Sequence, residues 1–127
     1  GKEFDQHLEK VGPDRIWVAE LDKKIIGLTS LIINGHEAEV EPVIVASDHR
    51  GRGIGKALLN HAVNKARERG VLCLSVKPVA RNLKAVSFFH YSGFNILGHI
   101  QMFMWLGESA PDTWKPGPTI FDKPFLY

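Results

Sequence analysis

The chain has 127 residues, of which 44% are hydrophobic and 24% are charged, and its formal net charge is +2. This length and composition are typical of one globular domain and exclude two ordinary domains. No window approaches the roughly 18 apolar residues of a membrane-spanning helix, and the first residues show no secretory signal pattern. We therefore expect neither a membrane partner nor secretion.

The chain contains one cysteine, Cys73, within the apolar run VLCLSV. A lone cysteine excludes an internal disulfide and favours a reducing compartment, so we expect a cytoplasmic location. Free cysteines are among the most buried residue types, and Cys73 is expected to be a small core residue, not a nucleophile. No two of the six histidines lie four residues apart, so a zinc site is unsupported and we expect no bound metal.

Charge is distributed unevenly along the chain. Residues 1–48 carry ten acidic and five basic residues, whereas residues 49–84 carry nine basic residues and one acid, Glu68. The basic segment favours an anionic partner and the acidic segment a cationic one, although two oppositely charged solvated faces would give the same counts. The nine basic residues are Arg50, Arg52, Lys56, Lys65, Arg67, Arg69, Lys77, Arg81 and Lys84.

The first part of the chain predicts three strands, preceded over residues 2–11 by what resembles the end of a helix closed by GPD. The β-branched apolar runs 16–21 and 25–33 flank the polar DKK and predict a hairpin. The turn sequence NGHE contains the Asn-Gly pair that favours tight hairpins, and a third strand follows over 38–46.

The third predicted strand carries two carboxylates and a proline. Glu39 and Glu41 are two residues apart, so their side chains are expected on the same side of the strand. Pro42 cannot donate a hydrogen bond to a neighbouring strand. Strand pairing should therefore be interrupted near Pro42.

The stretch SDHRGRGIGKAL, residues 47–58, places three glycines two apart, with an arginine before and after the first of them, at the start of a predicted helix. Apolar residues at helical spacing indicate that helix, and Gly70 after two arginines predicts its end. A short buried strand follows over 71–76. Because a helix connects it to the strand over 38–46, the two strands should be parallel.

The remaining chain predicts one more helix, one or two strands and a tail. LKAVSFFHYS indicates a helix that ends at Gly93, and FNILGHIQMFMWL alternates as a strand or two strands. Residues 107–127 hold four of the seven prolines without periodicity. We place a domain at residues 1–106 and an irregular proline- and aromatic-rich tail at residues 107–127. The tail is expected to pack along its own chain, to cover a groove or to reach a neighbouring chain.

A strand, a glycine-rich turn and a helix together offer free main-chain N–H groups and the positive end of a helix to a phosphate. The Walker pattern fails here because Arg50 and Ala57 replace its first glycine and its hydroxyl residue. The dinucleotide pattern fails because Lys56 replaces its last glycine. A third pattern, R/Q-x-x-G-x-G/A, fits every position from Arg50 to Gly55.

With this motif the chain resembles the GNAT superfamily, the acetyl-CoA-dependent N-acetyltransferases. About 30 residues after Gly53, RNLKAVSFFHYSGF resembles the second signature of that family: an Asn, then an Ala, then an aromatic pair, ending in Gly-Phe. The resemblance covers residues 16–106 in order. It implies an α/β fold with a mixed, mostly antiparallel central sheet, a splayed parallel strand pair and flanking helices.

The resemblance also implies where acetyl-CoA, the acyl donor, would bind. Main-chain N–H groups from Gly51 to Lys56 would surround the pyrophosphate, and the third strand would hydrogen-bond the pantetheine like a missing strand. Asn82 matches the position that touches the cofactor arm. The candidate cofactor-binding residues are Val43, Ile44, Val45, Arg50, Gly51, Arg52, Gly53, Ile54, Gly55, Lys56, Asn82 and Phe89.

Acetyl transfer to an amine requires the neutral amine, and a lysine-like amine with a pKa of about 10.4 is neutral only about once in 10³ at pH 7. A carboxylate that removes the proton directly or through water is therefore useful. Glu41 and Glu39 are the candidate catalytic residues, with plain edge carboxylates or substrate-orienting charges as the alternative. A main-chain N–H near Val43–Val45 would meet the oxyanion.

Two features depart from the family pattern. Phe89 stands where a family tyrosine often protonates the leaving thiolate; Tyr91 lies about 200° away around a helix, and Ser87 and His90 are weaker substitutes. Water would then protonate the thiolate, or activity would be low. In addition, only about fifteen residues precede Ile16. The chain is therefore expected to lack the family's N-terminal strand and helix, through truncation or replacement by the tail or a partner chain, and to have an incomplete acceptor pocket.

Three functions remain in competition. The first is an N-acetyltransferase that moves acetyl from acetyl-CoA to a primary amine by direct attack in a ternary complex, with a cationic amine favoured by Glu37, Glu39 and Glu41. The second is a non-catalytic acyl-CoA-binding module of the same fold, favoured by Phe89 and by the expected lack of the N-terminal elements. The third, a nucleic-acid binder, is disfavoured because the basic residues lie where the coenzyme would need them. A homodimer is left open.

Overall fold

The computed structural model describes residues 7–11 and 15–127. Two compact units divide the chain: residues 1–77, which hold the sheet and the first helix, and residues 78–127, which hold the second helix. Within the described residues no helix is long and apolar enough to cross a membrane. The elements are β1 (His7–Val11), β2 (Arg15–Leu21), β3 (Lys24–Asn34), β4 (Glu37–Val45), the 3-10 helix η1 (Ser47–His49), α1 (Ile54–Glu68), β5 (Cys73–Ser75) and α2 (Leu83–Tyr91).

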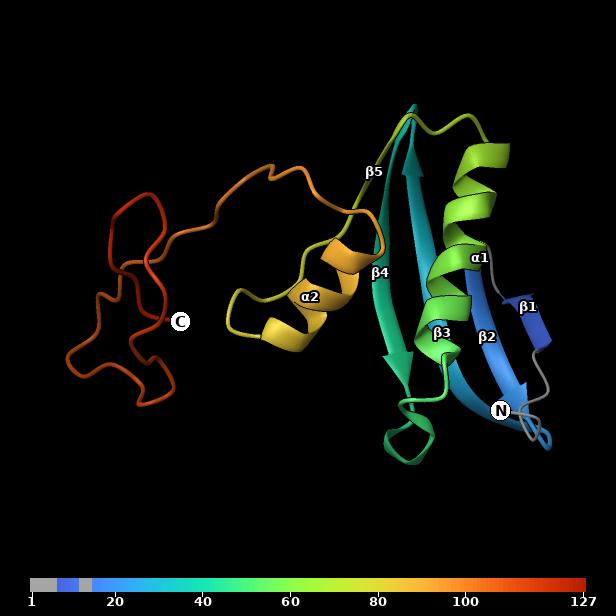
Figure 1. Ribbon diagram of the computed structural model, residues 1–127, viewed down its shortest axis with the longest axis horizontal. Coiled ribbons are helices and arrows are strands. Elements are labelled where there is room, and N and C mark those ends of the chain that lie inside the picture. The colour runs from blue at the N-terminus through green and yellow to red at the C-terminus, as the bar shows by residue number, and fades with distance from the viewer. Residues whose placement is uncertain (1–6, 12–14) are drawn as a thin grey trace. The chain divides into compact units, whose positions relative to one another are not determined.

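The strands form one five-stranded sheet in the order β1-β2-β3-β4-β5 (Figure 1). Neighbours are antiparallel except β4 and β5, which are parallel. The predicted hairpin is confirmed as β2 and β3, joined by Asp22 and Lys23, both with positive φ. The third predicted strand is β4, and its parallel pairing with β5 is also as expected. The mixed, mostly antiparallel sheet confirms the predicted fold class.

The first strand was not anticipated. Residues 7–11 form β1, which pairs antiparallel with β2 from His7 opposite Glu20 to Val11 opposite Ile16, so the expectation of a helix end is wrong for these residues. Without β1, the main-chain groups on the outer side of β2 would lack a neighbouring strand. Pairing with β2 therefore determines the structure of this short segment, whatever its local preference.

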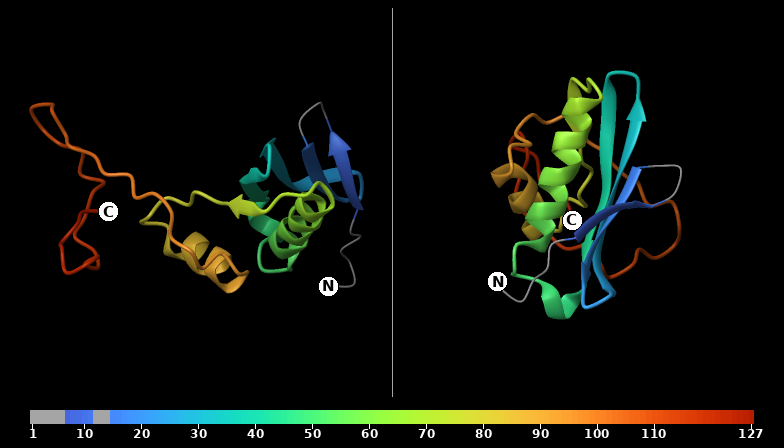
Figure 2. Two further views of the ribbon diagram at one scale, coloured as in Figure 1. Left: turned by 90° about the horizontal axis from the view of Figure 1, so that it is seen from above. Right: turned by 90° about the vertical axis from the view of Figure 1, so that its right-hand side faces the viewer.

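Helix α1 packs across one face of the sheet (Figures 1 and 2). Gly27 of β3 lies beneath it, where an added Cβ would be only 3.0 Å from Leu58 Cδ1 and from the Ile44 main-chain oxygen. The helix therefore contacts the sheet where β3 has no side chain. The core here consists of Ala19, Ile26, Ile54 and Leu58.

Both helices end at the predicted glycines. After α1, the Val71 N–H donates to Ala66 O and the Gly70 N–H donates to Arg67 O, with Gly70 at φ +76°. This double hydrogen bond is the Schellman motif, which needs a left-handed residue and hence favours glycine. Gly93, at φ +111°, ends α2 with the same pattern of bonds.

Strand pairing is interrupted at Pro42, as predicted. Val40 pairs with Leu31 and Val43 pairs with Thr29, so Glu41 and Pro42 of β4 lie opposite the single residue Ser30. This is a β-bulge, which inserts an extra residue and shifts the alternation of side chains. As a result Val40 and Val43 lie on the same face of the sheet although they are three residues apart.

Strand β5 is shorter and more exposed than expected. It covers only Cys73–Ser75 instead of 71–76, and Cys73 is exposed, so the prediction of a buried core cysteine is wrong. The reason is its position: β5 is the last strand of the sheet and pairs with β4 over three residues only.

The segment 94–106 forms no strand, so that prediction is also wrong. Alternation describes only the side chains, whereas a strand requires a neighbour to complete its main-chain hydrogen bonds. None of the described strands pairs with this segment, and its side chains from Met102 to Leu106 are exposed. Within 107–127 the pairing consists of two isolated bridges, Pro116 with Leu126 and Ile120 with Lys123.

Candidate functional site

Part of β4 has an open edge. The Ala46 N–H donates to Ile26 O at 2.7 Å and so faces β3. By the alternation of an antiparallel ladder, Ile44 also directs its main-chain groups to β3, whereas Val43 and Val45 direct theirs away. Strand β5 pairs only with residues 37–39 of β4, so no described strand lies beside Val43 and Val45. The parallel pair separates there, and an extended ligand has main-chain partners on β4.

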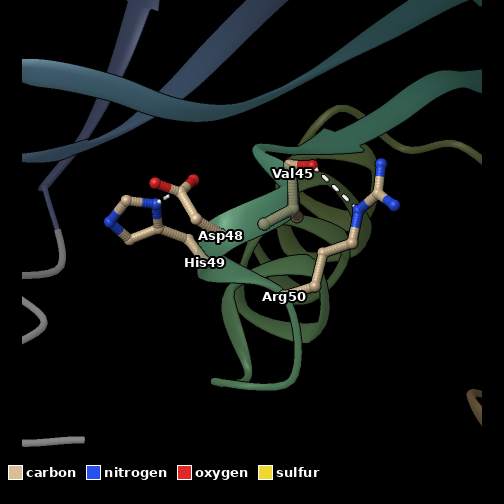
Figure 3. A network of polar contacts seen from close by, with 4 residues as sticks. All are labelled: Val45, Asp48, His49 and Arg50. Atoms are coloured by element: carbon tan, nitrogen blue, oxygen red, sulfur yellow. Dashed lines mark hydrogen bonds and ion pairs between the residues drawn. The ribbon is translucent and has the colours of Figure 1, made fainter.

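The chain turns sharply at the end of this open edge. Figure 3 shows Arg50 reaching back so that its Nε donates to Val45 O at 3.2 Å. In the same view His49 Nδ1 lies 3.0 Å from Asp48 Oδ1. This hydrogen bond lowers the pKa of the Asp48 carboxyl. Arg50 thus occupies the carbonyl of Val45 and positions the loop that follows.

The loop leads into α1 with its first N–H groups unused. The first helical hydrogen bond joins the Ala57 N–H to Gly53 O at 3.0 Å. The N–H groups of Ile54, Gly55 and Lys56 precede it and have no hydrogen-bond acceptor within the described part of the chain. Such free donors, together with the positive end of the helix dipole, form a binding site for an anion.

Two loop glycines have backbone conformations that other residues rarely adopt. Gly51 has φ +79° and Gly53, the N-cap of α1, has φ +81°. A Cβ built on either would meet nothing within 4 Å, so the space beside them is open to a ligand. Arg52 and Lys56 are exposed on either side of Gly53 and add positive charge.

A carboxylate pair lies on the face of the sheet opposite α1. Ala38 and Val40 are buried in the core, so Glu39 between them projects to the other face. Glu39 and Glu41 lie close enough for each to shift the pKa of the other, which agrees with their predicted common side. Lys77 Nζ lies 3.1 Å from Glu39 Oε1. The structure therefore brings the two candidate catalytic carboxylates together and adds an ammonium group.

The two carboxyl groups of the pair differ in acidity. The hydrogen bond from Glu41 and the nearby Lys77 lower the pKa of Glu39. The hydrogen bond and the charge of Glu39 raise the pKa of Glu41. Glu39 is thus the stronger acid of the two, and Glu41 binds a proton more readily.

Lys77 is the member of this cluster that sequence reasoning missed. The sequence predicted that the two strands are parallel but not their register, which places Ser75 opposite Glu39 and Lys77 two residues beyond.

Asn82 and Phe89 belong to the second unit and have local roles there. The Asn82 side chain accepts a hydrogen bond from the Ala85 N–H at 3.1 Å and caps α2. The Phe89 ring contacts Phe88 and Phe94 edge-on, with centroids 5.2 and 5.8 Å apart. A contact of either residue with a cofactor stays a prediction.

A family model, described as the acetyltransferase (GNAT) family, matches residues 2–94. An uncharacterized N-acetyltransferase of Methanocaldococcus jannaschii is 32% identical over 94 residues, which cover 68% of this chain and 42% of that protein. The ribosomal protein bS18-alanine N-acetyltransferase of Escherichia coli K12 is 31% identical over 68 residues, which cover 54% and 45%. The chain thus spans less than half of each of these curated relatives.

Two solved acetyltransferase structures also resemble this chain. The IAA acetyltransferase from Bacillus cereus has a TM-score of 0.63 at 29% identity, covering 67% of this chain and 57% of that one. A streptothricin acetyltransferase candidate from Bacillus anthracis, solved in complex with acetyl coenzyme A, has a TM-score of 0.60 at 28% identity, covering 65% and 48%.

Proposed function

This chain belongs to the acetyltransferase (GNAT) family, and from this premise we propose that it transfers the acetyl group of acetyl-CoA to a primary amine by direct attack in a ternary complex. The observation that carries the proposal is the open edge of β4 leading directly to the free N–H groups at the start of α1. A ligand with an extended arm and a phosphate end matches this combination. The Bacillus anthracis relative, which holds acetyl coenzyme A, supports the same ligand.

The proposed cofactor site divides into a phosphate part and an arm part. Main-chain N–H groups from Gly51 to Lys56 bind the pyrophosphate, and Arg52 and Lys56 balance its charge. The open edge of Val43 and Val45 hydrogen-bonds the pantetheine arm. This placement directs the thioester toward the middle of β4, where the two carboxylates lie.

The proposed chemistry starts with proton removal from the acceptor amine. Glu39 accepts the proton, directly or through water, because its carboxylate lies on β4 at the point where the parallel strand pair separates. The neutral amine then attacks the thioester carbonyl, and an outward N–H of Val43 or Val45 stabilises the oxyanion. Phe89 supplies no proton, so the thiolate, whose pKa is about 8.5, takes one from water.

We infer that the acceptor is cationic. Glu37, Glu39 and Glu41 place three acidic groups on β4, and Glu37 and Glu41 are exposed. A protonated amine is attracted to such a surface before it is deprotonated for attack. A protein N-terminus, a polyamine and an amino sugar all satisfy this description. The cytoplasmic location stays a prediction that rests on the lone Cys73.

The second candidate function is a non-catalytic acyl-CoA-binding module of the same fold. One observation favours it: the ring at position 89 has no proton to give and is packed against two other phenylalanines. Such a module would bind acetyl-CoA at the same loop and edge but would not turn it over.

Acetyl transfer to a panel of primary amines, followed by release of coenzyme A thiol and by product mass, separates the two functions. Transfer to at least one cationic amine is expected, and Glu39→Gln should lower its rate by roughly 10²-fold or more, the usual contribution of a general base. Glu68→Gln, on α1 away from the site, is the matched control and should keep the wild-type rate. Binding of acetyl-CoA without transfer to any amine would favour the module instead.

A further inference from the structure

One amine of the chain itself already lies against the candidate base. Lys77 Nζ is 3.1 Å from Glu39 Oε1, and the Lys77 side chain is 76% exposed whereas that of Glu39 is 20% exposed. The other lysine ion pair in the described part of the chain joins Lys65 to Glu68 on α1. The Lys77 ammonium group is thus accessible from solvent and lies beside a largely covered carboxylate.

The amine of Lys77 belongs to a residue just beyond the end of the β4–β5 pairing. Glu39 opposite Ser75 is the last pair of the β4–β5 ladder, and Lys77 follows two residues after Ser75. Beyond this point β4 continues to Val45 without a described neighbour on that side. Lys77 therefore lies at the closed end of the gap whose open edge, under the proposed function, binds the coenzyme arm.

We propose that Lys77 is a site of self-acetylation, in which its Nζ is the acceptor for the acetyl group of acetyl-CoA bound to the same chain. This inference rests on the proposed function. It requires no second substrate, because the amine, the base and the edge that leads to the thioester belong to the described residues 37–77.

The reaction balances with the groups present. The Lys77 ammonium gives one proton to the Glu39 carboxylate, and the freed electron pair of Nζ forms the new C–N bond to the thioester carbonyl carbon. The C–S bond breaks, and its electron pair leaves with the sulfur of coenzyme A. The second proton of the nitrogen is lost as the amide forms and passes to the thiolate through water, and Glu39 returns its proton to solvent.

Acetylation would change the site that it uses. The product amide is neutral, so the positive charge that now faces Glu39 disappears. Glu39 and Glu41 would then face an external cationic amine without a competing ammonium group. The modification would therefore precede, and favour, transfer to other acceptors.

The test incubates the full chain with acetyl-CoA and no added amine, and follows intact mass and peptide mapping. One acetyl group is expected on Lys77, formed at a rate that does not depend on protein concentration. Lys77→Arg keeps the charge but should abolish the modification, and Glu39→Gln should slow it about tenfold or more. The exposed Lys115 and Lys123 in the same sample report spontaneous acetylation.

Acetylation of Lys77 no faster than that of Lys115 and Lys123, or unchanged in Glu39→Gln, would overturn the proposal. A protein that binds acetyl-CoA and transfers acetyl to an added amine, yet leaves Lys77 unmodified, would overturn self-acetylation alone and leave the proposed function in place. A protein that neither binds acetyl-CoA nor transfers its acetyl group would overturn both.

Discussion

Gly53 combines an unusual backbone conformation with open space at the start of α1. Its φ of +81° lies in the left-handed region, and a Cβ there would touch nothing within 4 Å. Packing within the protein therefore does not require the absence of a side chain at this position. In the proposed function the bound ligand requires that a side chain be absent, because the pyrophosphate must approach the N–H groups that follow.

Gly53→Val should abolish measurable coenzyme A binding in calorimetric titration, at least a hundredfold loss, since the side chain blocks this approach. Gly35→Val is the matched control: Gly35 has φ +65° in the β3–β4 turn, also with nothing near its Cβ. Both variants carry a similar conformational cost of about 1–3 kcal/mol. Equal coenzyme A affinity in the two variants would contradict the phosphate site.

His61 is a partly buried histidine whose ring has few polar neighbours. It contacts Trp17 edge-on with centroids 5.2 Å apart, and within the described residues its Nε2 has no hydrogen-bond partner. Burial lowers its pKa below the ordinary value of 6.5, and the charge of Lys65 adds to this effect. The fold thus favours the neutral ring.

The sign of the resulting pH effect follows from linkage. Above pH 6.5 the ring is neutral in both the folded and the unfolded state, so it has no influence. Below that value the unfolded chain takes up the proton first, and the free energy of unfolding falls until the folded ring is protonated too. Thermal unfolding between pH 7 and pH 5 should show a smaller loss of stability in His61→Phe than in the wild type. An equal loss of stability in the wild type and in His61→Phe would contradict this prediction. The control is His99→Phe, because His99 is exposed.

At the scale of elements, sequence signals with a local cause were reliable. The two glycine helix stops, the β2–β3 hairpin and the interruption at Pro42 each depend on a few neighbouring residues, and the structure shows all of them. Strand β1 and segment 94–106 depend on whether a distant part of the chain supplies a pairing partner. Alternation or a turn signal in the segment itself holds no information about that partner.

The same distinction applies to the candidate site. The glycine motif and the common side of Glu39 and Glu41 follow from local spacing, so both could be predicted. The hydrogen bond from Arg50 to Val45 O and the ion pair from Lys77 to Glu39 depend on how the chain turns and on where β5 ends. Neither is visible in the spacing of residues.

Gly27→Ala tests how closely α1 approaches β3. The added methyl group would lie 3.0 Å from the main-chain oxygen of Ile44, which cannot move without disturbing β4. Overpacking of this kind costs about 1–3 kcal/mol, measurable as a lower midpoint in urea. Gly98→Ala, where a Cβ would meet nothing, should change stability by no more than about 0.5 kcal/mol. Equal stability of both variants and the wild type would contradict the close contact.

At the scale of the molecule, the basic residues of 49–84 include those that the proposed phosphate site needs. Attraction between these charges and phosphates weakens with salt, because the Debye length falls from about 10 Å at 0.1 M to about 3 Å at 1 M. The Kd for acetyl-CoA should therefore rise over this range, and by a smaller factor in Arg52→Ala. Lys115→Ala, in the tail, should show the wild-type salt dependence. A Kd that does not change with salt would contradict a role for these charges.

The most direct test of the account is thermal unfolding of the chain with acetyl-CoA, with coenzyme A and with ATP as a control. At a ligand concentration of about 100 times Kd, binding to the folded state adds roughly 2.7 kcal/mol, which raises the Tm by several degrees. The account predicts such a rise with both coenzyme A forms and little change with ATP. No rise with either coenzyme A form, or an equal rise with ATP, would contradict the coenzyme site on β4 and α1.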